Sequence, residues 1–370
     1  DYTGAGVNIG VFDAGVPSDE ETVGMNVVET LGEYNGTHPG FVASILKEIA
    51  PSANYYFAGN AAGVSYAGCI EWLLDQGVDV INTSLSVGGD GNSVYGNFAK
   101  WLDHIAYNHY VLLVKSAGNT SALISCPGMA YNIMTVGAMK PSGSDYVLES
   151  FSGYYTGNTY ASKPDICAIG TNGTSEAAPR VTATAALLIQ LQPLLIYSPE
   201  SIKAILAASV DTSTSQHYVP TQRSTSGTNY LKAGAGLMST ANALELESNN
   251  QSRCSTLTAS KTTQTYTFTI SNSNVGSTVR VALAYCVPVD AVGTHTSENF
   301  EAYTIPNLDL RIYAPGNSTA SYISGSANNN NVEIIEFTPE IAGSYTIEVA
   351  TISGTDSTEN IYFGVAWSIQ

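Results

Sequence analysis

Four polar side chains stand where the chain could carry out chemistry. Asp13 follows a short apolar run, Asn119 ends another such run, and His38 and Ser175 each open a segment with a helical pattern. An Asp, a His and a Ser together are the parts of an acyl-transfer enzyme. A serine hydroxyl is a weak nucleophile near neutral pH, and it needs a base within about 3 Å.

Each of these residues also has an ordinary structural interpretation. An Asp after a strand is usually a turn or cap residue, and a lone histidine such as His38 is usually a satisfied structural residue. Asn119 fits a turn and Ser175 fits a helix N-cap. Taken singly, the structural interpretation is favoured for all four. Their combination and their order along the chain favour the catalytic one.

The elements that must position these residues alternate along the first two thirds of the chain. Near-continuous apolar runs of strand length, typical of strands buried on both faces, lie at 6–15, 79–89, 110–119 and 131–139. Helical patterns lie at 40–49, 67–77, 97–109, 175–192 and 198–209. This alternation predicts an α/β fold with a mainly parallel sheet and helices on both faces. Such sheets place their sites at the C-terminal ends of strands.

The pattern changes near residue 247. The stretch ESNNQSRCSTL (247–257) is polar and is interpreted as a linker. After it, apolar and polar residues alternate in short runs separated by turn signals, which predicts an all-β, jelly-roll-like sandwich. We therefore predict two domains, 1–247 and 256–370. The linker is too short for free tethering, so we expect the sandwich to dock on the first domain.

Composition excludes several classes of function. The net charge of −18 makes nucleic-acid binding unfavourable, since like charges repel. No apolar run reaches the roughly 18 residues that a membrane helix needs. The five cysteines show no CxxC spacing, which argues against a zinc site. One of them must lack an intrachain partner, and Cys254 and Cys286 are a possible pair across a sheet.

Nine short blocks resemble the signature segments of the subtilisin-like serine peptidases, in the same order. The main ones are VFDAG (11–15), HPGFVAS (38–44), VINTSLS (80–86), SAGN (116–119) and GTSEAAPRV (173–181). Secondary ones are TVGA (135–138), SFSG (150–153), KPDICAIG (163–170) and GAGLMSTANAL (234–244). The resemblance covers nearly all of 1–245. The later segments NLDLRIYAPGN (307–317) and AGSYTIEV (342–349) resemble a β-sandwich that is appended to some members.

The resemblance implies a fold and a set of roles. The fold would be the subtilisin-like three-layer α/β fold. Asp13 would orient His38, His38 would act as general base and then general acid, and Ser175 would be the nucleophile. Asn119 would donate its side-chain amide to the oxyanion, together with the backbone N–H of Ser175. No cofactor and no metal are implied.

Substrate binding is also implied by the resemblance. Ser84, Leu85 and Ser86 would pair with the substrate backbone as an added strand. The segment Ser116, Ala117 and Gly118 would form one wall of the pocket for the side chain before the scissile bond. Neither segment contains an Asp or Glu that would indicate a preference for Arg or Lys.

The chain departs from the family pattern in three places. The histidine block reads NGTHPGF, so one alignment puts Asn35 at the catalytic position and the other puts His38 there; we prefer the second, because VAS (42–44) then falls at the expected offset. Glu176 replaces an apolar residue after the nucleophile, and we expect it to raise the pKa of His38. The connection 54–69 has no acidic residue, so we expect no calcium loop there.

Three functions are compatible with these observations. The first is a serine endopeptidase that acts on protein or peptide substrates. The second is an inactive pseudo-peptidase that binds peptides, and the third is a related transpeptidase or cyclase. The resemblance further implies a matured form without its propeptide. We expect a secreted or cell-surface bacterial protein, acting as a monomer.

Overall fold

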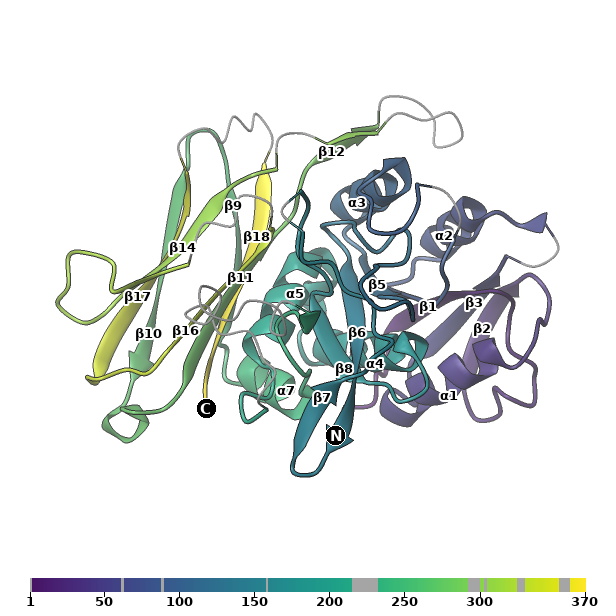
Figure 1. Ribbon diagram of the computed structural model, residues 1–370, viewed down its shortest axis with the longest axis horizontal. Coiled ribbons are helices and arrows are strands. Elements are labelled where there is room, and N and C mark those ends of the chain that lie inside the picture. The colour runs from purple at the N-terminus through teal and green to yellow at the C-terminus, as the bar shows by residue number, and fades with distance from the viewer. Residues whose placement is uncertain are drawn as a thin grey trace.

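The computed structural model describes residues 2–60, 63–87, 90–157, 159–214, 232–291, 300–302, 305–324, 330–352 and 360–370. Figure 1 shows two regions side by side: an α/β region in purple to teal, and a β-sandwich in green to yellow. This division follows the predicted order of the two parts along the chain.

An eight-stranded sheet forms the centre of the first region and confirms the predicted α/β architecture. Its order is β2-β3-β1-β4-β5-β6-β7, with β8 also paired to β6, and every pairing except β6 with β7 is parallel. The strands are β1 (Asn8–Asp13), β2 (Asn26–Leu31), β3 (Asn54–Gly59), β4 (Val80–Thr83), β5 (Leu112–Ser116), β6 (Met134–Ser142), β7 (Asp145–Leu148) and β8 (Ile166–Ile169).

Helices cover both faces of this sheet (Figure 1). They are α1 (His38–Ile49), α2 (Tyr66–Asp75), α3 (Asn97–His109), α4 (Thr174–Leu191), α5 (Pro199–Ala208) and α7 (Thr240–Ser248). One apolar cluster joins α1 and α4 to residues such as Val11 of β1. A second joins α2 and α3 to Phe12, its neighbour on the same strand. Successive residues of β1 therefore serve opposite layers, as expected for a strand buried on both faces.

Four strands of the sheet were not predicted: β2, β3, β7 and β8. The segment that holds β3 belongs to 54–69, which was interpreted as a connection. Tyr55 and Phe57 instead are buried against α1, and β3 pairs with β1 along its whole length. The edge strand β2 is mostly exposed, so it carries no apolar run that a sequence pattern could detect.

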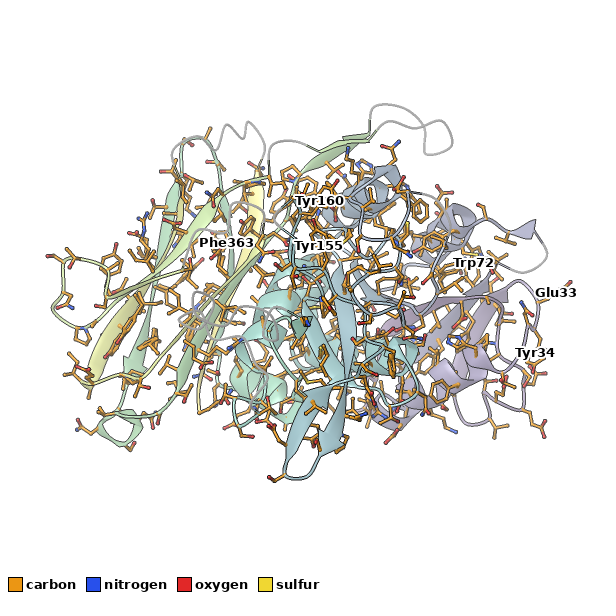
Figure 2. All side chains as sticks on the ribbon, viewed as in Figure 1. Glu33, Tyr34, Trp72, Tyr155, Tyr160 and Phe363 are labelled. Carbon is orange, nitrogen blue, oxygen red and sulfur yellow. The ribbon has the colours of Figure 1, made fainter. Side chains whose placement is uncertain are left out.

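The second region consists of two four-stranded antiparallel sheets, as predicted, and its jelly-roll-like topology stays a prediction. The sheets have the orders β10-β17-β14-β15 and β16-β11-β18-β9. Their core residues include Phe363 of β18 (Figure 2). The strands are β9 (Ser252–Leu257), β10 (Thr263–Ile270), β11 (Val279–Tyr285), β14 (Leu308–Tyr313), β15 (Tyr322–Ile323), β16 (Val332–Phe337), β17 (Gly343–Thr351) and β18 (Ile361–Ile369), with the separate pair β12 (Val289–Ala291) and β13 (Phe300–Ala302).

The interpretation of 247–257 as a linker is wrong for all but residues 249–251, because α7 includes Glu247 and Ser248. Strand β9 begins at Ser252 and pairs with β18 as an edge of the sandwich. Its side chains are mostly half-buried and polar, which is typical of an edge strand and resembles a linker in sequence. The true connection between α7 and β9 is therefore only a few residues long.

The sandwich docks on the first region through α5, as expected. The side chain of Arg280 in β11 is fully buried. Its Nε donates to the carbonyl of Ala207 at 2.9 Å and its Nη2 donates to the carbonyl of Ala235 at 2.8 Å. Ser368 of β18 donates to the carbonyl of Ala208 at 2.7 Å. A cation at the C-terminal end of a helix is favourable, because carbonyls there lack partners within the helix.

All five cysteines are free, so the possible pair of Cys254 and Cys286 is wrong. Cys254 lies on β9, and Cys286 follows β11, on opposite sides of the intervening β18. Two strand spacings separate them by about 9–10 Å, beyond the reach of a disulfide. In the part of the chain that the structure describes, no helix has the length and apolar character needed to cross a bilayer.

Candidate active site

The candidate residues meet at one edge of the central sheet. Asp13 ends β1, Ser84 follows β4, and Asn119 lies three residues beyond β5. These three strands are adjacent and parallel, so their C-terminal ends point the same way. Helices α1 and α4 begin with His38 and with Thr174 and Ser175. The order of the parallel strands therefore brings together residues that lie up to 162 positions apart in the sequence.

Asp13 and His38 form a direct pair. The His38 Nδ1 lies 2.8 Å from Asp13 Oδ2 and 2.9 Å from Oδ1. Oδ1 also accepts the N–H of Ala14 at 2.7 Å, and the carboxylate is almost fully buried. A carboxylate at Nδ1 keeps the proton on that nitrogen, which leaves Nε2 as an acceptor in the neutral ring.

The pKa of His38 is raised above its ordinary value of 6.5. The hydrogen bond to Asp13 is the main cause, and the negative charge of Asp13 adds to it, while partial burial opposes both. The His38 side chain is 44% exposed, so a substrate or probe can reach the ring. The predicted contribution of Glu176 is wrong, because Glu176 is not among the groups that raise this pKa.

Glu176 instead organises the loop before α4. Its Oε2 accepts the backbone N–H of Asn172 at 3.0 Å and the side-chain amide of the same residue at 3.3 Å. Its other oxygen lies 3.6 Å from the Arg180 guanidinium. An acidic residue in the first turn of a helix is favourable beside the free N–H groups there. These contacts direct the Glu176 carboxylate to the loop.

Ser175 is the second residue of α4 and is half-buried. Its Oγ donates to the carbonyl of Ser84 at 3.1 Å. In return the Ser84 hydroxyl donates to the carbonyl of Ser175 at 3.4 Å. Among the hydrogen bonds of the described residues, none joins Ser175 Oγ to His38. The structure therefore brings the hydroxyl to the edge that carries the pair, with its proton directed to Ser84.

Pro179 explains why the carbonyl of Ser175 is available to Ser84. In a regular helix that carbonyl would accept the N–H of residue 179, four positions later. Proline has no N–H, so the acceptor is left without its helical partner. The Ser84 hydroxyl occupies that place and ties the start of α4 to the end of β4. A second link is made by Asn82, whose Oδ1 accepts the Thr182 hydroxyl at 3.0 Å.

The Asn119 side chain is held by Thr174. Its Oδ1 accepts the backbone N–H of Thr174 at 2.9 Å and the Thr174 hydroxyl at 3.0 Å. The same hydroxyl accepts the N–H of Gly118 at 3.0 Å. With Oδ1 engaged on one side, the Nδ2 amide of Asn119 is left as a donor for another group.

Gly173 is required by the same arrangement. Its φ of +145° lies in the region that side chains rarely adopt, and a Cβ there would meet the Asn119 Nδ2 at 3.1 Å. A side chain at this position would press on the amide that the family resemblance assigns to the oxyanion. The glycine before the helix thus keeps the approach to Ser175 open.

The segments predicted to bind substrate lie beside the site with different exposures. Ser84 is buried, Leu85 is half-buried and Ser86 is exposed. On the other side, Ser116 and Ala117 are buried, and Gly118 is half-buried. Asn35, the alternative to His38, lies in the loop before α1 and donates to the carbonyl of Ala14 rather than to Asp13.

Two residues at the site were missed by the sequence analysis. Thr174 could not be recognised, because its partners Gly118 and Asn119 lie more than 50 positions away. Lys115 did give a signal, since it is the one charged residue in the apolar run YVLLVKSAGN. A charge inside a strand expected to be buried on both faces is unusual and indicates a specific role.

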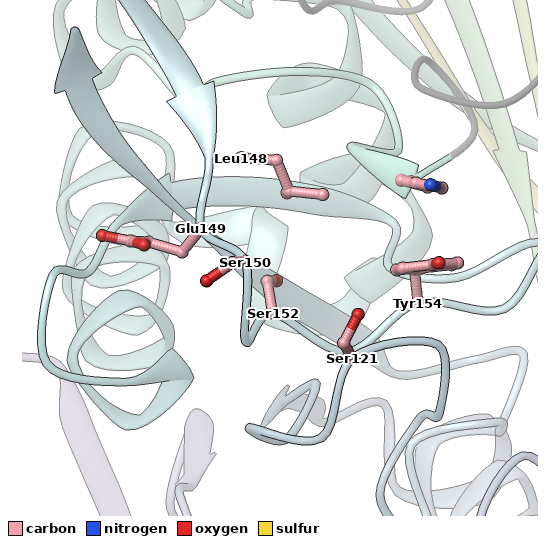
Figure 3. A pocket seen from close by; sticks show the side chains of 7 residues that line it. Ser121, Leu148, Glu149, Ser150, Ser152 and Tyr154 are labelled. Carbon is pink, nitrogen blue, oxygen red and sulfur yellow. The ribbon is translucent and has the colours of Figure 1, made fainter.

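A pocket of about 260 Å³ borders the Asn119 loop (Figure 3). Ser121 forms one side, two residues after Asn119, and Tyr154 and Lys232 form another. The Lys232 ammonium lies over the Tyr154 ring at 4.6 Å from its centroid. Gly153 connects this pocket to the site, because its N–H donates to the carbonyl of Gly118 at 2.9 Å.

The described residues include no cluster of three or more His, Cys, Asp and Glu side chains that could hold a metal ion. The chemistry that the arrangement offers is that of a hydroxyl, an imidazole and a carboxylate next to amide donors. These are the groups for attack on a carbonyl carbon and for stabilising the oxygen anion that results.

Two protein-family models match this chain. Residues 32–231, more than half of the chain, match the subtilase family, and residues 251–351 match the bacterial pre-peptidase C-terminal domain. The first match includes His38, Asn119 and Ser175 but begins after Asp13, whose assignment rests on its contact with His38.

Individual relatives are subtilisins. Subtilisin DY of Bacillus licheniformis is 28% identical over 233 residues, covering 52% of this chain and 80% of the relative. Subtilisin BL of Lederbergia lenta is 31% identical over 220 residues, covering 52% and 79%. Among solved structures, the patellamide maturation protease PatA has a TM-score of 0.51 at 20% identity, covering 66% of this chain and 98% of that one, which supports the fold alone. The chain therefore belongs to the subtilase family of serine proteases.

Proposed function

We propose that this protein is a serine endopeptidase that hydrolyses peptide bonds through Asp13, His38 and Ser175, with Asn119 as an oxyanion donor. The observation that carries the proposal is the 2.8 Å contact of His38 with Asp13 at the strand edge where Ser175 opens α4. We favour this function over a peptide-binding pseudo-peptidase, since all three groups of the machinery are present.

The first step is activation of the serine. The Asp13 carboxylate holds the His38 ring by Nδ1, which leaves Nε2 to accept the Ser175 proton. The Ser175 hydroxyl must first leave the carbonyl of Ser84 and turn to His38. Such a rotation of a hydroxyl-bearing side chain is fast, and catalytic hydrogen bonds commonly tighten only when substrate is bound. His38 then passes the proton to the leaving amine.

The second requirement is a donor for the oxyanion. When Ser175 Oγ attacks the carbonyl carbon of the substrate, the carbonyl oxygen of the substrate becomes negative. The first N–H groups of a helix have no partners within it, so the N–H of Ser175 near the start of α4 can donate. The Asn119 Nδ2 supplies a second donor, because Thr174 holds the oxygen end of that amide. Water then hydrolyses the acyl-enzyme by the same route, with His38 again as the base.

The segments flanking the site would bind an extended peptide. Ser84, Leu85 and Ser86 continue beyond β4 and would pair with the substrate backbone. Ser116, Ala117 and Gly118 continue β5 and would flank the side chain before the scissile bond. We further propose a catalytic domain over 1–247 and a β-sandwich domain over 256–370. Because β9 pairs with β18, the sandwich domain would begin earlier, at Ser252. The protein would act outside a bacterial cell, as a monomer.

An active-site probe tests the proposal. The full chain is treated with a fluorophosphonate, and the labelled peptide is identified by mass spectrometry. We expect one label, on Ser175, and none in Ser175→Ala. The matched control Ser260→Ala, in the second region, should be labelled like the parent. Peptides bound without any label or cleavage would favour the pseudo-peptidase instead.

A further inference from the structure

Lys115, the fourth residue of β5, is a buried lysine. Its side chain is 1% exposed, and among the described residues no carboxylate lies within ion-pair distance of it. Its Nζ donates only to neutral oxygens: the carbonyl of Ser116 at 2.5 Å, the Ser116 hydroxyl at 3.3 Å and the Ser125 hydroxyl at 3.0 Å. Burial lowers the pKa of Lys115 to about 7.

A second buried lysine in the same region has a carboxylate partner that compensates its charge. Lys163 is also inaccessible, and its Nζ lies 2.8 Å from Asp165. Burying a charge without a counter-charge is costly, and the lowered pKa of Lys115 means that burial favours its neutral form. Lys115 lacks the partner that Lys163 has. An anion placed near Lys115 would raise its pKa again and favour the charged form.

The place of Lys115 suggests where that anion comes from. The segment Ser125–Cys126 links Ala117, in one segment proposed to bind substrate, to Val87, which directly follows the other segment. The N–H of Ser125 donates to the carbonyl of Ala117 at 2.8 Å, and the carbonyl of Cys126 accepts the N–H of Val87 at 3.3 Å. Ser125 therefore lies at the base of the interval between the β4 and β5 extensions, with the Lys115 ammonium behind its hydroxyl.

The Ser125 hydroxyl can connect Lys115 to a ligand through hydrogen bonds, because it can accept one and donate one at the same time. Its Oγ accepts from Lys115, so its own proton must point elsewhere. The acceptor for that proton is the carbonyl of Ser116 at 3.4 Å, which is near the limit for an O–H donor. A carboxylate would take this proton in a shorter and stronger bond, since an ionised acceptor roughly doubles the strength of a hydrogen bond.

We propose that Lys115 makes this protease prefer substrates with a carboxylate side chain, Glu or Asp, immediately before the scissile bond. The carboxylate accepts from the Ser125 hydroxyl and lies one hydroxyl group away from the Lys115 ammonium. This inference rests on the proposed function, because it uses the segments assigned there to substrate binding. The net charge of −18 disfavours acidic peptides at long range, so a preference for them requires a local cation such as Lys115.

A matched peptide series tests this inference. Peptides identical except for Glu, Gln, Asp or Leu before the scissile bond are incubated with the full chain at pH 7, and kcat/KM is measured for each. Glu and Gln have the same shape, so their ratio isolates the charge. We expect kcat/KM to be at least tenfold higher for Glu than for Gln, as for a hydrogen bond to a charged group. Equal values, or a preference for Gln or Leu, would overturn the inference.

Variants then assign the preference to Lys115. In Lys115→Met the Glu to Gln ratio should fall to near one, and in Ser125→Ala it should fall several-fold. Lys261→Met, the same change at an exposed lysine of the sandwich, should keep the parent ratio. A parent that prefers Glu and a Lys115→Met variant that keeps this preference would also overturn the assignment.

The outcomes separate this inference from the proposed function. If Ser175 is labelled by fluorophosphonate and peptides are cut without preference, only the inference fails. If no peptide is cut and no label appears, both fail. Should Lys115→Met not fold, as judged by circular dichroism and thermal melting, the parent series and Ser125→Ala still decide the question.

Discussion

The two halves of the candidate site differ in how much of their working geometry is already formed. In the proposed oxyanion half, the side chain of Asn119 is already held in place: its oxygen accepts two hydrogen bonds from Thr174, and the Thr174 hydroxyl accepts the N–H of Gly118. In the proton-transfer half only the pair of Asp13 and His38 is made. The Ser175 hydroxyl, which should complete it, donates to Ser84 instead.

Burial accounts for this difference. Thr174 is 1% exposed, and its hydroxyl and N–H would be costly to leave without partners, so the network around it must form whether or not substrate is present. His38 is 44% exposed at the start of a helix without a side-chain cap. Water can satisfy an exposed imidazole, so its bond to Ser175 can wait for substrate. We therefore expect the oxyanion half to be rigid and the proton-transfer half to be completed on binding.

Removing the base should give the largest loss of activity. In His38→Ala we expect kcat to fall by roughly 10⁶-fold, the loss recorded for the same group in subtilisin. Combining it with Ser175→Ala should cost almost nothing more, because the two groups act as one unit. Hydrolysis of a chromogenic peptide is the measurement. His109→Ala, at an exposed site on α3, serves as the control and should match the parent.

Replacing Asp13 should cost less than replacing His38, because the imidazole remains. In Asp13→Asn we expect a fall in kcat of roughly 3 × 10⁴-fold, the loss recorded for the corresponding carboxylate in subtilisin. The matched control Asp19→Asn, at an exposed site, should be fully active. Loss of activity in Asp19→Asn, or none in Asp13→Asn, would contradict the assignment of the carboxylate.

The pH dependence of kcat/KM tests the same pair from another direction. His38 must be neutral to act as a base, and Asp13 raises its pKa, so activity should increase with pH through a midpoint above 6.5. In Asp13→Asn both contributions of the carboxylate are lost while partial burial still lowers the pKa. The midpoint should therefore move to lower pH. A midpoint that stays in place would show that another group sets it, and Glu176→Gln, for which no shift is expected, is the comparison.

Damage to the oxyanion half should be smaller than damage to the base. In Asn119→Ala we expect kcat to fall by about 10²–10³-fold with little change in KM, because the bond forms only in the transition state. The N–H of Ser175 would remain as one donor. Asn108→Ala on α3 is the control. An increase in KM with kcat preserved would instead show that Asn119 binds the ground state.

The sequence predicted the parts of this comparison that local patterns can encode. Strands β1, β4 and β5 were found because burial on both faces makes them apolar, and α3 matches its predicted range. The edge strands β2 and β9 were missed, since half-exposed strands carry polar residues. Asp13, His38, Ser175 and Asn119 were named from their types and order. The direction of the Ser175 hydroxyl and the role of Thr174 depend on contacts between distant segments, which no local sequence pattern encodes.

The smallest expected effect tests how rigid the oxyanion half is. Thr174→Val keeps the shape of the side chain but removes the hydroxyl that joins Asn119 to Gly118, so we expect kcat to fall about tenfold, the value of one net hydrogen bond. Thr174→Ser, which retains the hydroxyl, should lose much less. If Thr174 acts only by holding the Asn119 amide, Thr174→Val should cost nothing further in the Asn119→Ala background. An equal loss in both backgrounds would mean that the hydroxyl acts elsewhere, and that the amide is positioned by the backbone N–H of Thr174 alone.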